Sequence, residues 1–160
     1  MTYQIWAPWR MKYILASKNE EGCFLCKAGE SRDDAANFVV YRAKLCFCIL
    51  NRYPYNNGHL LVAPYAHKPD LCDLTPEESA DAVAAICEMQ RRMRSAMKPD
   101  GFNIGINIGK ISGAGLPGHI HFHIVPRWEG DTNFMPVLAD TKVIPQALEE
   151  VYRLLKANDE

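Results

Sequence analysis

Three histidines alternate with apolar residues in the segment His119-Ile120-His121-Phe122-His123-Ile124-Val125, which is followed by Pro126 and Arg127. Side chains on a β-strand point to opposite faces in turn, so a strand here would gather the three imidazoles on one face. Imidazole acts as nucleophile, proton donor or metal ligand near neutral pH. The alternative is a solvated strand face of ordinary composition, but three of the chain's five histidines fall within these few residues. The segment therefore predicts an active site.

A second alternating segment precedes the histidines. Residues 103–109 place isoleucines on one face and Asn or Gly on the other, and a Gly-rich loop over 110–118 joins this segment to the histidines. Two like-patterned strands joined by a loop favour an antiparallel pair. We expect the isoleucines to pack on helices and Asn107 to share the open face with the imidazoles. Backbone amides of the loop could bind an anion, although most loops of this composition are only turns.

The remaining elements follow from local patterns. Strands are expected over 38–42, 45–50 and 59–63, with a connector over 51–58. A helix should begin after Thr75, where Pro76 and Glu78 complete a capping box, and end before Pro99. Its apolar stripe reads as core rather than as a cofactor site and consists of Val83, Ile86, Met89, Met93 and Met97. A second helix is expected from Pro145.

Composition excludes several classes of protein. The 160 residues are 48% hydrophobic and 23% charged with a formal charge of -1, as in an ordinary globular domain, and no long basic run indicates a nucleic-acid partner. Arg91, Arg92 and Arg94 fall on the expected helix and read as its solvated face. No apolar run reaches the length of a membrane span, and the N-terminus lacks the pattern of a signal peptide. We therefore expect a cytoplasmic protein with reduced cysteines and no membrane partner.

A Cys-x-x-Cys pair, Cys23 and Cys26, lies near the N-terminus. By itself the pair supplies half of a tetrahedral zinc site. A thiol-redox function lacks the thioredoxin context, and two buried reduced cysteines are as good an interpretation of the pair alone. The residues leave this choice open.

The histidine segment and its surroundings resemble the histidine triad (HIT) family over Cys23 to Trp128. The resemblance rests on the His-x-His-x-His pattern within Gly118–Arg127, on Asn51 ahead of Gly58–Pro64, and on Asn107 and Gly109 before the loop. It implies an α+β fold with a five-stranded antiparallel sheet and two main helices, the sheet being extended by dimerisation. We expect a single domain over 1–160, with an aromatic N-terminal arm over 1–20, a core over 23–128 and a C-terminal helical segment over about 145–157.

Roles for the histidines follow from the resemblance. His121 matches the nucleophile that attacks the α-phosphorus, His123 matches a histidine beside the phosphate, and His59 matches a further histidine next to the nucleophile; His119 completes the triad. Attack at phosphorus by imidazole needs a neutral ring whose far nitrogen is oriented by a hydrogen bond, together with donors for the phosphate oxygens. The pattern supplies residues for each of these tasks.

The nucleotide contacts also follow from the resemblance. Asn51 matches the residue that binds the ribose hydroxyls, Ile49 lies where the family packs the base, and Asn107 corresponds to a phosphate contact. The chain departs from the family where many members have Gly-Gln-Ser/Thr, because it has Gly115-Leu116-Pro117-Gly118 and lacks the hydroxyl. Backbone amides such as that of Gly115, or Ser112, could replace it, and Arg127 beyond the triad is a further expected nucleotide contact.

Metal binding is implied by the same resemblance. Several bacterial HIT proteins bind zinc through a cysteine pair, a later histidine and the first triad histidine. In this chain these residues are Cys23, Cys26, His67 and His119, and we expect one structural zinc ion per chain.

The segments Trp6–Ile14 and Lys142–Gln146 are similar to a narrower bacterial branch that includes diadenosine tetraphosphate phosphorylases. The expected reaction is phosphorolysis of diadenosine tetraphosphate to ATP and ADP through a covalent nucleotidyl-histidine, with inorganic phosphate as acceptor. One alternative is a hydrolase of dinucleoside polyphosphates or nucleoside phosphoramidates that releases AMP. Another is a purine-nucleotide-binding protein without catalysis, although binding alone needs no nucleophile. A homodimer or tetramer is expected, and no nucleic-acid partner.

Overall fold

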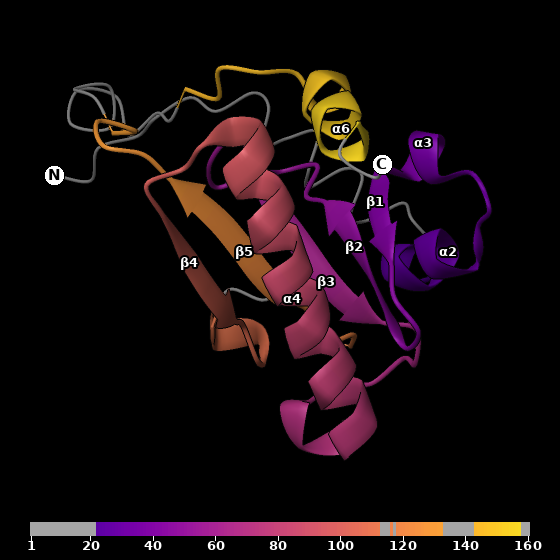
Figure 1. Ribbon diagram of the computed structural model, residues 1–160. Coiled ribbons are helices and arrows are strands. Elements are labelled where there is room, and N and C mark those ends of the chain that lie inside the picture. Colours follow the sequence, from indigo (N-terminus) through magenta and orange to yellow (C-terminus); the bar gives the residue numbers. More distant parts are fainter. Residues whose placement is uncertain (1–21, 113–115, 117, 133–142, 158–160) are drawn as a thin grey trace, which may run out of the picture.

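The computed structural model describes residues 22–112, 116, 118–132 and 143–157 (Figure 1). Five strands form one antiparallel sheet in the order β1-β2-β3-β5-β4. The strands are β1 (Val39–Arg42), β2 (Cys46–Leu50), β3 (Leu60–Pro64), β4 (Gly101–Ile106) and β5 (Phe122–Arg127). This confirms the predicted fold class and the antiparallel pairing of the histidine segment with its neighbour.

Helices cover both faces of the sheet. The long helix α4 (Pro76–Met97) and the C-terminal α6 (Leu148–Lys156) lie on one face, where α4 packs against β2 and β3 (Figure 1). The short helices α2 (Phe24–Glu30) and α3 (Asp34–Asn37) precede β1, and the 3-10 turns are η1 (Leu71–Asp73) and η2 (Lys110–Ser112). None of the helices in the described part of the chain combines the length and apolarity needed to cross a bilayer.

The period-two pattern of the strands divides the core into two parts. Even-numbered side chains of β2 and β3 join α4 and α6 in the larger core, which includes Cys48, Leu60 and Met89. Odd-numbered side chains such as Phe47 and Leu61 face the other way and pack with Leu25 of α2. The two faces therefore have different partners, and the face toward α2 is the one that carries the histidines.

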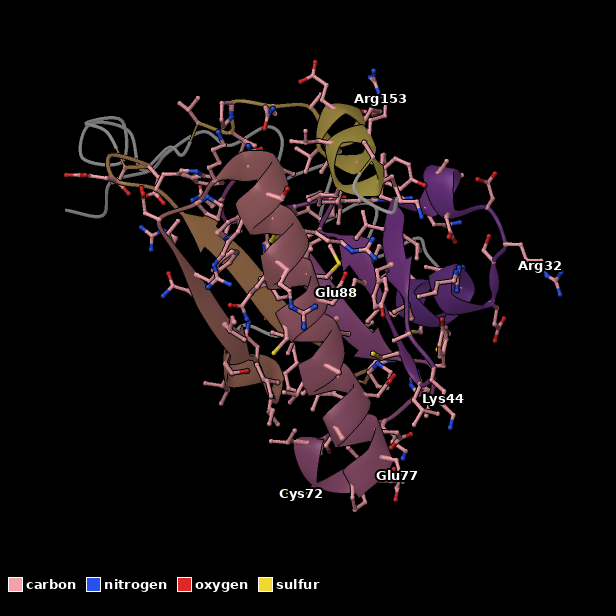
Figure 2. All side chains as sticks on the ribbon, in the orientation of Figure 1. Arg32, Lys44, Cys72, Glu77, Glu88 and Arg153 are labelled. Carbon is pink, nitrogen blue, oxygen red and sulfur yellow. The ribbon has the colours of Figure 1, made fainter. Side chains whose placement is uncertain are left out.

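Helix α4 forms as its capping residues predict. The Thr75 hydroxyl accepts from the Glu78 amide, the Glu78 carboxylate accepts from the Thr75 amide, and Pro76 occupies the first turn. Charged residues such as Glu77 and Glu88 lie on the side of α4 away from the sheet (Figure 2). Val83, expected in the core, is 55% exposed, and Ala82 and Ala85 are buried in the stripe instead.

Three further expectations need correction. Strand β5 begins at Phe122, so His119 and His121 lie in the segment that leads into it rather than on it. Ile104 and Ile108 are 45% and 43% exposed: β4 is an edge strand and Ile108 lies beyond its end, although Phe102 of β4 packs on the core that includes α4. The C-terminal helix begins at Leu148 rather than at Pro145.

Candidate functional site

Strand register brings the histidine segment together with residues from distant parts of the chain. On the face toward α2, Ile49 pairs with Leu61, Leu61 pairs with His123, and His123 pairs with Gly105. A side chain added at Gly105 would meet no atom within 4 Å, so the surface beside His123 is open. Neighbouring strands lie about 4.8 Å apart, which places Ile49 roughly 10 Å from His123 across the sheet.

His59 and His123 form a directly bonded pair, with 2.9 Å between His59 Nε2 and His123 Nδ1. The Tyr55 backbone N–H donates to His59 Nδ1 at 3.0 Å, so this nitrogen is an acceptor and the ring carries its proton on Nε2. His59 therefore donates to His123 Nδ1. Neutral His123 must then carry its own proton on Nε2, which becomes a donor available to a ligand.

His121 presents the opposite chemistry. Its Nδ1 lies 2.9 Å from the carbonyl oxygen of His119 and donates to it, which leaves a lone pair on Nε2. The ring is 6% exposed, and its centroid lies 5.0 Å from that of His123. The site thus offers an acceptor nitrogen on His121 beside a donor nitrogen on His123.

Burial keeps these rings neutral. Loss of hydration, followed by the neighbouring His123 and His121, lowers the pKa of His59 to about 3. The same desolvation, with His121 as a secondary cause, lowers the pKa of His123 to about 4. Burial also lowers the pKa of His121 below 6.5, opposed by its bond to the His119 carbonyl. At neutral pH the lone pair of His121 is therefore free to react.

A second cluster joins Cys23, Cys26, His67 and His119, whose candidate ligand atoms all lie within 4.8 Å of one another. His119 Nε2 donates to the Pro64 carbonyl at 2.9 Å, which leaves the Nδ1 lone pair facing Cys23 Sγ at 3.2 Å. His67 Nδ1 lies 3.2 Å from Cys26 Sγ. Burial, followed by the neighbouring Cys23, raises the pKa of Cys26 to about 11. Because a cation would stabilise both thiolates, these four groups could hold a metal ion.

The asparagines expected in the site lie beside the histidine pair. Asn51 Nδ2 lies 3.3 Å from His59 Nδ1, and Asn51 Oδ1 accepts from the Tyr53 amide. Asn107 Nδ2 lies 3.4 Å from His123 Nε2; with the His123 proton on Nε2, the Asn107 amide must turn so that its Oδ1 accepts from this nitrogen. Ile49 is 4% exposed and packs with Leu61 on the same face.

The expected anion donors are placed differently. The Arg127 guanidinium bonds to Asp131 at 2.6 Å and to Asn103 at 2.9 Å. It lies four residues beyond His123 along β5, so this geometry argues against a direct phosphate contact. Ser112 Oγ donates to the Gly109 carbonyl at 2.7 Å. Gly115 lies outside the described residues, and the same holds for the expected arm over 1–20.

Sequence reasoning missed Tyr55, which contacts both members of the histidine pair. It also missed the carbonyls of His119 and Pro64, which orient two of the rings. The positions of carbonyl groups depend on backbone conformation, so they cannot be predicted from residue types alone. The one available signal was an aromatic residue four positions before a histidine in a turn-rich segment.

Comparison with known proteins adds independent observations. The HIT domain family model matches residues 32–130. The AP-4-A phosphorylase of Mycobacterium tuberculosis is 40% identical over 159 residues, which cover 95% of this chain and 82% of that protein. The asymmetrical bis(5'-nucleosyl)-tetraphosphatase of Schizosaccharomyces pombe is 38% identical over 93 residues, covering 58% and 50% of the two chains.

The fold is similar to a solved structure as well. A zinc-bound histidine triad family protein from Mycobacterium smegmatis matches with a TM-score of 0.68 and 34% identity, covering 88% of this chain and 93% of that one. The family match spans the sheet and the histidine segment, and the tuberculosis relative is similar over nearly the whole chain. The chain therefore belongs to the HIT domain family.

Proposed function

We propose that the protein transfers an adenylyl group from diadenosine tetraphosphate to inorganic phosphate and releases ATP and ADP. The observation that carries the proposal is the buried neutral His121, whose Nδ1 is held by the His119 carbonyl and whose Nε2 lone pair lies beside the His123 donor. The similarity to a protein named AP-4-A phosphorylase over nearly the whole chain supports the choice of substrate and acceptor.

The reaction proceeds in two displacements at one phosphorus atom. His121 Nε2 attacks the α-phosphorus, a P–N bond forms, and the P–O bond to the departing ATP breaks. A phosphate oxygen then attacks the same phosphorus, the P–N bond breaks, and ADP leaves. The His123 Nε2–H donates to the phosphoryl oxygens as negative charge develops on them. Each step conserves the adenylyl group.

The nucleotide would lie across the sheet. Asn51 binds the ribose hydroxyls, the base packs against Ile49, and Asn107 contacts the phosphate. The row from Ile49 through Leu61 to His123 supports this direction, because it leads from buried apolar side chains to the donor nitrogen of His123. The open surface over Gly105 would leave room for the rest of the polyphosphate.

The acceptor phosphate needs its own donors. From their place in the sequence we assign them to the Gly113–Gly115 amides and Lys110, because Arg127 is engaged by Asp131 and Asn103 and the Ser112 hydroxyl donates to the Gly109 carbonyl. A bound phosphate would compete with water through position and effective concentration rather than through greater reactivity.

A structural zinc ion fits the four-residue cluster. Ligand atoms around tetrahedral zinc lie about 3.4–3.8 Å apart, and the sulfur–nitrogen contacts in the cluster are 3.2–3.5 Å. Cys23, Cys26, His67 and His119 would hold the ion, which would supply structural stability and no chemistry. His119 would then connect the metal to catalysis, since its carbonyl fixes the tautomer of His121. All six cysteines are free thiols, which suits the reducing cytoplasm.

One other activity has specific support. The similarity to a bis(5'-nucleosyl)-tetraphosphatase favours water as the acceptor, with AMP as a product and the same histidines. A binding protein without catalysis is disfavoured, because binding needs no oriented neutral imidazole beside a donor.

Product analysis tests the proposal. Purified protein is incubated with diadenosine tetraphosphate in buffers with increasing inorganic phosphate, and nucleotides are separated by ion-exchange chromatography. We expect ATP and ADP, at a rate that saturates with phosphate. If the products are ATP and AMP and the rate does not depend on phosphate, the enzyme is a hydrolase and not a phosphorylase. If there is no turnover, the proposal of an enzyme is itself wrong.

A further inference from the structure

Tyr55 covers the histidine pair of the site. Its ring centroid lies 4.6 Å from that of His59, at an interplanar angle of 32°, and 5.6 Å from that of His123, at 26°. Tyr55 is 53% exposed, whereas His59 beneath its ring is 1% exposed. A solvated aromatic ring thus lies over two buried imidazoles.

The backbone of Tyr55 acts on the same pair. Its N–H donates to His59 Nδ1 and thereby fixes which nitrogen of His59 carries the proton. The ring and the amide of one residue therefore contact the same imidazole from two directions. Together they hold the orientation in which His59 Nε2–H points to His123 Nδ1.

The turn that carries Tyr55 is itself anchored. Asn56, the next residue, is buried and donates to the Pro126 carbonyl and to Asp131 at 2.9 and 2.8 Å. Gly58 adopts a positive φ of 72°, and a Cβ there would lie 2.9 Å from the Met97 side chain. The backbone that follows Tyr55 is therefore bonded to β5 and packed closely on α4, which fixes the position from which the ring reaches the histidines.

We propose that Tyr55 is a positioning residue, whose ring excludes water from the His59–His123 pair and holds both imidazoles in their bonded arrangement. This inference rests on the proposed function only for its kinetic consequence. The charges of His123 and His121 lower the pKa of His59, and the charge of His121 lowers the pKa of His123. Tyr55 determines how far water reaches this set.

Titration of the histidines by NMR tests the proposal without nucleotide. In Tyr55→Ala, water reaches the pair, so the pKa values of His59 and His123 should rise toward 6.5 by roughly 1 or more. Tyr55→Phe should titrate like the wild-type protein, because the ring and the amide remain. Tyr53→Ala is the matched control: Tyr53 lies in the same turn and its amide donates to Asn51, but the ring contacts of the histidines are made by Tyr55.

Kinetics provide a second readout. Tyr55→Ala should lower kcat roughly ten- to a hundredfold with a smaller change in KM, and Tyr55→Phe should restore it. Wild-type titration and kcat in Tyr55→Ala would overturn the proposal. So would a change in KM alone, which would make the ring a substrate contact. If Tyr55→Ala does not fold, Tyr55→Leu is the second variant, because it keeps an apolar side chain at this position but no flat ring. Unchanged histidine titration and unchanged kcat in folded Tyr55→Leu would show that the ring is not needed and would overturn the proposal.

The two proposals fail separately. A wild-type protein without turnover would contradict the proposed function, whereas the NMR titration would still measure the effect of the Tyr55 ring. Unchanged titration in an active enzyme would overturn the role of Tyr55 alone.

Discussion

Each imidazole of the site has one nitrogen committed to a fixed partner. His121 donates to the His119 carbonyl, His119 donates to the Pro64 carbonyl, and His59 accepts from the Tyr55 amide. These bonds select the tautomers, and the tautomers determine which nitrogen keeps a lone pair and which carries a proton, as the proposed roles require. With His123, which accepts from His59, the four histidines therefore present different nitrogens to their surroundings.

The neutral state of His121 predicts the pH dependence of the reaction. Its pKa is lowered by burial, so the nucleophile stays unprotonated below 6.5 and becomes protonated only as the pH falls through the lowered value. The rate constant kcat/KM should therefore hold steady from neutrality down past pH 6.5 and fall at lower pH. A pH–rate profile measures this, with metal content followed over the same range. Half-loss of activity at or above pH 6.5, with metal retained, would contradict the prediction.

Asn51→Ala should weaken nucleotide binding more than it slows the chemical step. Loss of the ribose contact should raise the Kd for AMP about tenfold, which corresponds to about 1.4 kcal/mol. Isothermal titration calorimetry with AMP measures the affinity, and steady-state kinetics measure kcat. Asn103→Ala is the control, since Asn103 bonds to Arg127 rather than to a histidine. An unchanged affinity would remove Asn51 from the site.

The sequence predicted which residues gather at the candidate site better than it predicted their surroundings. The alternation of histidines with apolar residues indicated the candidate site, although of the three only His123 lies on strand β5. Asn51, Asn107 and His59 lie beside it as the family resemblance implied. Tyr55 could not be placed from the sequence, because its ring reaches the histidines through the geometry of an irregular turn.

At the scale of elements, the cysteine–histidine cluster connects α2 to the segment before β5. If it holds zinc, the purified protein should contain about one zinc ion per chain by elemental analysis. Cys26→Ser should lose the metal and unfold at a lower temperature, with each 1 kcal/mol of stability worth roughly 2–4 °C in Tm. Cys72→Ser, at an exposed cysteine outside the cluster, is the control. Metal-free wild-type protein prepared without chelator would contradict the zinc proposal.

Elements with local signals were predicted closely, and those set by packing were not. Helix α4 follows from Thr75, Pro76 and Glu78, which are read directly from the chain. The exposure of Val83 and Ile104 depends on which neighbour covers each face, and no local pattern contains that information. The isoleucine alternation predicted a strand correctly, but Ile104 on that strand stays exposed while Phe102 packs on the core.

At the scale of the whole molecule, the exposed edge strand β4 predicts self-association. Ile104 and Ile108 are 45% and 43% exposed near the outer edge of β4, which pairs with no further strand among the described residues, and the cost of hydrating them favours a second copy. We expect a homodimer or tetramer by light scattering at micromolar concentration. Ile104→Lys should shift the mass toward a monomer, while Val83→Lys on α4 should leave it unchanged. A monomeric wild-type mass would refute the prediction.

The covalent intermediate on His121 is the central claim, and intact-protein mass spectrometry tests it most directly. Wild-type protein is mixed with diadenosine tetraphosphate without phosphate and quenched under alkaline conditions that preserve phosphoramidate bonds. The account predicts a mass increase of one adenylyl group, located on His121 by peptide mapping and removed by adding phosphate before the quench. His121→Asn should bind AMP and show no adduct. Turnover by the wild-type protein without any adduct, or an adduct on another residue, would contradict the account.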